Sequence, residues 1–128
     1  MTLLLDTHVL LWLINSPERI SDTASRALRS RENELVVSAA SLWETALKIE
    51  SGKLDVPMTS DYVDGHMSDI GISRVLDISP THIYTMLSIP RIHSDPFDRL
   101  LAAQSISENM RLVTADRIFK KYPVNVLW

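Results

Sequence analysis

Cysteine is absent from the sequence, and glycine and proline are scarce, with three and six copies among 128 residues. Without cysteine the chain can form neither a disulfide nor a thiolate metal site, which excludes most zinc-binding patterns. The glycines and prolines do not gather into a run, and no long block of like charge is present, so neither a linker nor a disordered tail is expected. With 45% apolar residues, residues 1–128 are predicted to form a single domain with its own core.

The sequence also lacks an apolar run long enough to span a membrane. Residues 1–14 are largely apolar, but Asp6 and His8 interrupt them and no basic residue precedes them. The stretch is also shorter than the roughly 20 residues that a membrane helix needs. A buried strand followed by a helix explains it better. We therefore expect no membrane association, and the missing cysteines are compatible with the reducing cytoplasm, where we place the protein.

Net charge is small and negative, at −3. A negative protein is poorly suited to bind a polyanion, but the basic residues of the second half gather near two of the acids discussed below. They are Arg91, Arg99, Arg111, Arg117, Lys120 and Lys121. If a bound metal ion offset the nearby acids, the surface around them would become positive.

Apolar periodicity predicts strands that alternate with helices. The predicted strands are residues 3–6, 34–37, 72–78, 111–114 and 124–127. The predicted helices are residues 7–14, 21–31, 39–50, 59–70, 79–87, 96–106 and 117–121, with caps at Ser21, Ser79 and Asp95. The helix 96–106 is apolar on nearly every side and is expected to be buried. This alternation is typical of an α/β protein with a parallel sheet covered on both faces.

Four acidic residues stand where such an alternation would bring them together. They are Asp6 at the end of the first strand, Glu44 in the third helix, Asp98 in the first turn of the sixth helix, and Asp116 just after the fourth strand. In parallel sheets, ligands gather at the carboxyl ends of the strands. Clustered carboxylates suit hard cations such as Mg²⁺ or Mn²⁺. The reaction that these ions most often catalyse is nucleophilic attack on phosphate esters. The pattern therefore predicts a divalent-metal site in a small nuclease.

Each acid also has a simpler explanation. Asp6 and Asp116 would each suit a helix cap, a role that contributes about 1 kcal/mol. Asp98 would complete a capping box that Asp95 begins, and Glu44 would lie on a solvated helix face. Helices elsewhere in this chain begin at serine, however, which caps equally well. Three aspartates on the predicted site face therefore call for more than capping.

Four segments of the sequence resemble the PIN domain family, in particular toxins of the virulence-associated protein C (VapC) type. The segments are LLLDTHVLLWL, VSAASLWE, HSDPFDRLLAAQ and LVTAD, and each holds one of the four acids. The resemblance covers nearly the whole chain, and four acidic motifs in the family's order are far more specific than one. It implies a PIN-like three-layer α/β/α sandwich around a central, mainly parallel sheet.

The resemblance further implies a metal-dependent endoribonuclease, the toxin of a type II toxin–antitoxin pair. Asp6, Glu44, Asp98 and Asp116 correspond, in this order, to the family's four acids, and Asp6 and Asp98 are the strongest candidates for metal ligands. Glu44 and Asp116 would complete the metal cage directly or through water, with Thr114 in support. Mg²⁺ or Mn²⁺ held there would activate water for hydrolysis of an RNA phosphodiester bond, so no histidine is required as a base.

Other polar side chains have weaker assignments. His8 is expected to be structural or to contact substrate, and Arg99, next to Asp98, is a candidate phosphate contact. The remaining histidines have no metal-ligand spacing. They are His66, His82 and His93.

The family resemblance also implies partners. The expected substrate is RNA, with tRNA and ribosomal RNA as the first to test. A cognate antitoxin is expected to fill the acidic site, and the toxin is expected to form a homodimer. The three tryptophans and the leucine-rich early helices are predicted to lie in the core. Any exposed apolar residues around Leu10, Leu11 and Trp12, or along residues 39–47, would provide the partner surfaces.

Two other classes of function stay open at this stage. The first is an aspartyl phosphotransfer hydrolase or a receiver-like domain, in which Asp6 would be the residue that becomes phosphorylated. Such hydrolases typically carry a second aspartate two residues after the nucleophile, where this chain has His8, and the acidic pair of receivers is also missing. The other class is a non-catalytic PIN module that binds metal and a partner. The presence of all four acids argues against that class.

Overall fold

The computed structural model describes all residues from Met1 to Trp128. The strands are β1 (Thr2–Leu5), β2 (Glu34–Ser38), β3 (Ile72–Leu76), β4 (Arg111–Val113) and β5 (Val126–Leu127). The α-helices are α1 (Thr7–Asn15), α2 (Asp22–Arg29), α3 (Ala39–Glu50), α4 (Ser60–Ile70), α5 (Pro80–Ser88) and α6 (Pro96–Ser107). Two 3₁₀ segments are η1 (Pro17–Arg19) and η2 (Arg117–Lys121). None of the helices has the length and apolar character that crossing a membrane requires.

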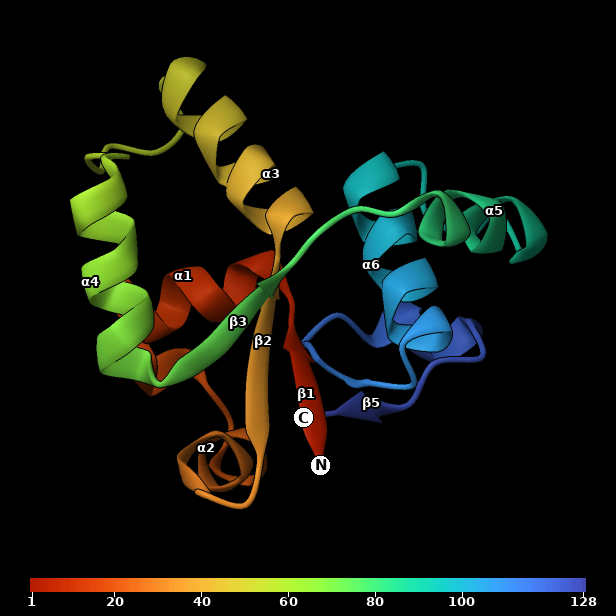
Figure 1. The fold of residues 1–128 in the computed structure, drawn as a ribbon, viewed down its shortest axis with the longest axis horizontal. Coiled ribbons are helices and arrows are strands. Elements are labelled where there is room, and N and C mark those ends of the chain that lie inside the picture. The colour runs from red at the N-terminus through yellow and green to blue at the C-terminus, as the bar shows by residue number, and fades with distance from the viewer.

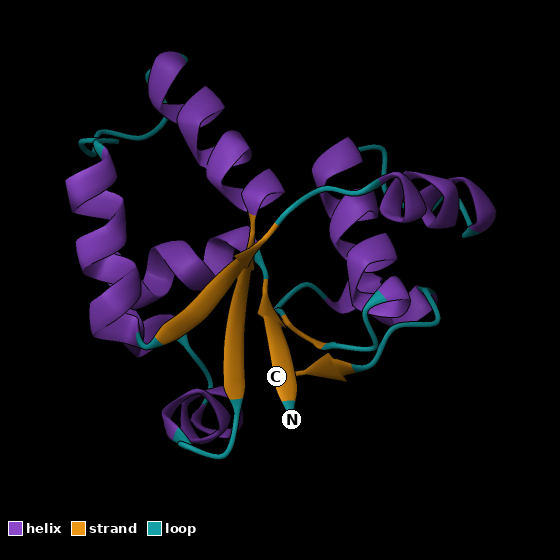
Figure 2. Cartoon of the chain, viewed as in Figure 1, coloured by secondary structure: helices purple, strands orange, loops and turns teal.

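The five strands form one sheet in the order β3-β2-β1-β4-β5, and every neighbouring pair is parallel. In the centre of the sheet, Leu4 of β1 pairs with Val36 of β2 on one side and with Leu112 of β4 on the other. Helices lie on both sides of the strands, which gives three layers (Figure 2). The predicted three-layer α/β/α fold with a parallel sheet is therefore confirmed.

Each face of the sheet carries its own apolar core, because successive side chains of a strand point to opposite faces. Leu3 and Leu5 of β1 pack in one cluster with residues of α1 and α2, among them Leu28. Leu4 packs in the other cluster with Leu101 of α6. In Figure 1, α1, α2 and α4 accordingly lie to the left of the strands and α5 and α6 to the right. The predicted burial of α6 is confirmed, since Leu100, Leu101, Ala102, Ala103, Gln104 and Ser105 are all buried.

Two helix starts form as the sequence predicts. The Ser21 hydroxyl accepts the backbone N–H of Ala24 at 3.1 Å at the start of α2. The Asp95 carboxylate accepts the N–H of Phe97 at 2.8 Å at the start of α6, with Pro96 at the first helical position. These side chains satisfy N–H groups that the first helical turn leaves unpaired.

Some predicted boundaries are wrong. The last strand is shorter than residues 124–127, because only Val126 and Leu127 pair with β4. The third strand ends at Leu76, where its pairing with β2 also ends. The 3₁₀ segment Pro17–Arg19 was not predicted.

The predicted core position of the leucine-rich early helix is confirmed for Leu10. Leu10 is 3% exposed, because it is on the face of α1 that packs against β1, whereas Leu11 and Trp12 are half-buried. In α3 the core prediction is wrong for Trp43, which is 57% exposed, and Leu47 beside it is 41% exposed.

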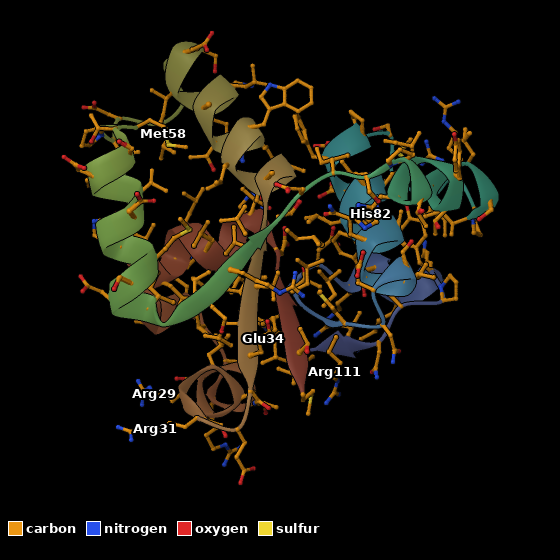
Figure 3. The ribbon with its side chains drawn as sticks, in the orientation of Figure 1. Arg29, Arg31, Glu34, Met58, His82 and Arg111 are labelled. Atoms are coloured by element: carbon orange, nitrogen blue, oxygen red, sulfur yellow. The ribbon has the colours of Figure 1, made fainter.

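His82 links α5 to α6 and is almost fully buried. Its Nδ1 accepts the backbone N–H of Ser79 at 3.0 Å, and its Nε2 lies 2.8 Å from Oε1 of Glu108. Figure 3 shows its ring between the two helices.

We expect His82→Ala to lower the free energy of unfolding by about 2 to 4 kcal/mol, because it leaves a cavity and an unpaired N–H. Urea denaturation measures this cost. Glu108→Gln keeps an acceptor for the ring and should cost less than about 1 kcal/mol. Equal stabilities of the wild type and His82→Ala would contradict a structural role for the ring.

Candidate active site

The strand order reverses at the centre of the sheet, because the chain moves outward from β1 to β2 and β3 and then returns to the other side for β4 and β5. At such a point, the connections leave adjacent strands in opposite directions and open a crevice at the strands' carboxyl ends. Asp6 directly follows β1 there, and Thr114 directly follows β4. Figure 1 shows that α1 and α3 also begin at this end of the sheet.

Asp6 is buried and occupies the cap position of α1, yet its side chain makes no capping hydrogen bond. Its Oδ2 instead accepts the hydroxyl of Thr114 at 2.7 Å. Burial raises the pKa of the Asp6 carboxyl above its ordinary value, and the charge of Glu44 adds to the rise, while the Thr114 hydrogen bond and the nearby His8 oppose it. Asp6 is therefore held in position by Thr114 rather than used as a helix cap.

Asp98 lies in the first turn of α6, and its carboxylate has no hydrogen bond or ion pair. The capping box expected with Asp95 does not form, since Asp95 alone accepts a backbone N–H. Burial raises the pKa of Asp98 to about 7, with further contributions from the charges of Asp95, Asp6 and Glu44 and an opposing one from His93. The acids are thus close enough to repel one another when ionised.

Asp116 follows β4 and caps η2, as its simpler explanation predicts. Its Oδ1 accepts the N–H of Ile118 at 2.9 Å, and its Oδ2 lies 2.9 Å from Nε2 of His93. Its backbone N–H donates to the Thr114 hydroxyl at 3.1 Å, while that hydroxyl donates to Asp6. Thr114 therefore joins the loop of Asp116 to the carboxylate of Asp6.

Glu44 lies on α3 with a side chain that is only 12% exposed, so the expectation of a solvated helix residue is wrong. Lys48, one turn later, approaches its Oε2 to 3.7 Å. The charge of Glu44 contributes to the raised pKa of both Asp6 and Asp98, which places it near the same cluster.

The two predicted substrate contacts, His8 and Arg99, differ in their relation to the acids. His8 is exposed at the start of α1, and its charge lowers the pKa of Asp6, so it lies near the site, with its ring 6.0 Å from that of Trp12 between centroids. The guanidinium of Arg99 donates to the backbone carbonyl of Met86 at 3.0 Å and forms no ion pair with any carboxylate. In this structure, Arg99 thus joins α6 to α5.

His93 is the residue that the sequence analysis missed. It lies in the loop before α6, and one ligand atom each from His93, Asp98 and Asp116 fall within 4.8 Å of one another. Its position follows no helical or strand period, and 23 residues separate it from Asp116. No spacing rule for metal ligands would have selected it.

The donor set fits a divalent cation. Carboxylate oxygens are the preferred ligands of hard ions, and here they come from three separate elements of the fold. Neither Asp6 nor Asp98 forms an ion pair with Lys or Arg, and burial raises the pKa of each, so these two carboxylates lack a basic partner. A bound cation would offset the repulsion and hold the acids ionised.

The sequence matches the PIN domain family over residues 3–125. Ribonuclease VapC22 of Mycobacterium tuberculosis is 34% identical over 125 residues, which cover 94% of this chain and 92% of that protein. Among solved structures, VapBC2 from Rickettsia felis, bound to a DNA fragment from its promoter, superposes with a TM-score of 0.66 at 22% identity, covering 98% of this chain and 97% of the other. FitAcB from Neisseria gonorrhoeae gives a TM-score of 0.61 at 18% identity, covering 97% and 95%. At these identities, the two structures establish a shared fold.

Proposed function

This chain belongs to the PIN domain family, and from that premise we propose that it is an endoribonuclease that depends on Mg²⁺ or Mn²⁺. The observation that carries the proposal is the convergence of Asp6, Asp98 and Asp116 at the point where the strand order reverses. The sequence likeness to Ribonuclease VapC22 supports RNA as the substrate. We further propose that residues 1–128 act as one domain and that the protein works in the cytoplasm, where its RNA substrate lies.

The proposed roles follow from the contacts of each side chain. Asp6 and Asp98 are the main metal ligands, because neither carboxylate is neutralised by a basic residue. Glu44 and Asp116 complete the cage directly or through water. Thr114 keeps Asp6 in place through its 2.7 Å hydrogen bond. Bound metal would supply Lewis acidity, lowering the pKa of coordinated water and offsetting charge on the phosphate.

The proposed substrate contacts lie around this cluster. His8 lies near Asp6 and is exposed, which suits a contact with RNA rather than a structural role. Arg99 could reach a phosphate only by giving up its bond to the Met86 carbonyl. Its Nε is buried and has no hydrogen-bond partner, so it too could donate to a phosphate only after the side chain moves.

A cognate antitoxin is the proposed protein partner. VapBC2 and FitAcB, which share this fold, are complexes named for two components, and the VapBC2 structure also holds promoter DNA. The exposed Trp43 and Leu47 on α3 offer an apolar surface for such a partner. The ring of Phe97 packs edge-on against that of Trp43, with 5.1 Å between the ring centroids. We also propose a homodimer, which light scattering of the isolated chain would test.

The proposal is tested by incubating the purified protein, free of antitoxin, with folded tRNA and ribosomal RNA in Mg²⁺ or Mn²⁺. We expect discrete cleavage products that disappear when a chelator removes the metal and in the Asp6→Asn variant. Circular dichroism of both controls establishes that the protein is still folded. No cleavage by a folded, metal-bound protein would favour a non-catalytic binding module, and cleavage that persists in chelator would refute the metal requirement.

A hollow of about 250 Å³ beside the cluster offers a path for the RNA backbone. Arg117 and Lys120 line it together with Thr114, Asp116 and Trp128. Both basic side chains are exposed, which leaves them free to contact phosphates.

We expect the double variant Arg117→Gln/Lys120→Gln to bind single-stranded RNA more weakly and with less salt dependence. Loss of two phosphate contacts should reduce the slope of log affinity against log salt by about 1.4. Fluorescence anisotropy in chelator measures this without cleavage. Arg29→Gln/Arg31→Gln is the matched control, because these side chains project into solvent near α2 (Figure 3). Equal slopes for the two double variants would place the RNA elsewhere.

A further inference from the structure

His93 is buried between two polar groups that hold its ring from both sides. Its Nε2 lies 2.9 Å from Oδ2 of Asp116, and its Nδ1 lies 2.9 Å from the hydroxyl of Tyr122. The backbone N–H of His93 also donates to that hydroxyl, at 2.8 Å. The rings of Tyr122 and Phe119 pack against the imidazole at 5.4 and 4.7 Å between centroids. This loop residue is therefore fixed in position and in orientation.

The hydrogen bonds define which ring nitrogen of His93 carries the proton. The Tyr122 hydroxyl already accepts the backbone N–H of His93, and Nδ1 of His93 is the partner to which it can donate its own single proton. Nδ1 is then the acceptor, so the neutral ring carries its proton on Nε2. The opposite tautomer would set a nitrogen lone pair against a carboxylate oxygen of Asp116. His93 therefore donates to Asp116.

This donor fixes the orientation of the Asp116 carboxylate. Oδ2 accepts from His93 and Oδ1 accepts from the N–H of Ile118, so rotation of the carboxylate would break both bonds. Each oxygen still has a second lone pair, and Asp98 is within 4.8 Å of this group. The nitrogen of His93 that faces the cluster carries a proton, which leaves it no lone pair with which to bind a cation.

We propose that His93 is a positioning residue of the metal site: it holds Asp116 in the orientation that binds the cation, and Tyr122 holds His93 in turn. The proposal rests on the proposed metal-dependent function, which requires Asp116 to act in the cage. Polar groups that orient metal ligands typically contribute 10- to 100-fold to metal affinity or activity. His93 acts at that level, without touching the metal.

The test measures Mn²⁺ affinity, for which electron paramagnetic resonance counts the free ion. We expect His93→Ala to bind Mn²⁺ about 10- to 100-fold more weakly than the wild type. His93→Gln places an amide N–H the same number of bonds from the backbone and should recover most of the affinity. Tyr122→Phe keeps the imidazole but removes the hydroxyl that holds it, so its Mn²⁺ affinity should lie between those of His93→Ala and the wild type. His66→Ala, on α4, is the matched histidine control and should bind like the wild type.

A second readout separates positioning from direct ligation. Electron spin echo modulation of the wild-type Mn²⁺ complex is expected to show no imidazole nitrogen coupled to the metal. A coupling that disappears in His93→Ala, with no rescue by His93→Gln, would overturn the proposal and make His93 a ligand. Unchanged affinity in a folded His93→Ala would also overturn it. If His93→Ala fails to fold, the contrast between His93→Gln and Tyr122→Phe decides the question.

The Mn²⁺ affinity is measured without RNA, so the positioning role of His93 and the ribonuclease function can fail separately. Histidine-dependent Mn²⁺ binding by a protein that cuts no RNA supports the positioning role and contradicts the ribonuclease function. A wild type that binds no Mn²⁺ overturns both.

Discussion

Replacement of Asp98 by Asn is expected to lower the rate of RNA cleavage by at least about 10²- to 10³-fold, the usual cost of removing one group that stabilises charge in a reaction. Asn has the same shape but no charge, so the change removes a metal ligand and leaves the packing of α6 intact. The carboxylate of Asp98 makes no hydrogen bond to the protein, and no structural bond is lost with its charge.

Asp95→Asn is the matched control, because Asn caps helices as well as Asp does. Single-turnover cleavage should be measured at pH 8 with saturating Mn²⁺. Asp95 raises the pKa of Asp98 through its charge, and at pH 8 Asp98 is largely ionised with or without that contribution. We expect near wild-type rates for Asp95→Asn. A folded Asp98→Asn that cleaves RNA as fast as this control would remove Asp98 from the metal cage.

The placement of Asp6 and Asp116 is predictable from chain order alone. Asp6 directly follows a short apolar strand and Asp116 comes three residues after another, and the carboxyl ends of parallel strands meet at one edge of the sheet. The family resemblance supplied the choice among the acids, since Asp95 lies only three residues before Asp98 and serves as a cap. Local sequence thus positions the acids, but their role as ligands is a proposal that the variants above test.

Other features depend on contacts between segments far apart in the sequence. His93 meets Asp116 only because the loop before α6 folds over η2, where Tyr122 holds it. Periodicity also does not identify which face of α1 packs on the sheet, because α1 is apolar on most sides and Leu11 stands beside the buried Leu10. In both cases the tertiary arrangement decides, and no local pattern records it.

The metal-free protein is expected to lose stability as pH rises from about 4 to about 8, which is the opposite of the usual behaviour of paired carboxylates. The pKa of Asp98 is raised from 3.8 to about 7, so in this range the folded state binds more protons than the unfolded state does. Stability falls with pH wherever that is so. Asp6 contributes in the same direction, because burial raises its pKa as well.

The size of the effect is set by how far solvent screens Asp98. The full difference in pKa corresponds to about 4 kcal/mol, and screening of this half-buried group reduces it to about 1 to 2 kcal/mol. Asp98→Asn abolishes the titration, so in chelator at pH 8 the variant should be more stable than the wild type by about 1 to 2 kcal/mol. At pH 4 the two should be nearly equal, because Asp98 is then protonated in the folded wild type.

Urea denaturation of both proteins between pH 4 and pH 8 measures this difference, and the titration of all other groups largely cancels in it. Mn²⁺ at about 100 times its dissociation constant should then stabilise the wild type at pH 8 by about 2.7 kcal/mol. Asp98→Asn should gain much less, since it lacks a ligand. A variant that is less stable than the wild type at pH 8 without metal would refute the repulsion between the acids. The uncompensated negative charge of Asp98 therefore has two effects: it destabilises the metal-free protein, and it favours the binding of a cation.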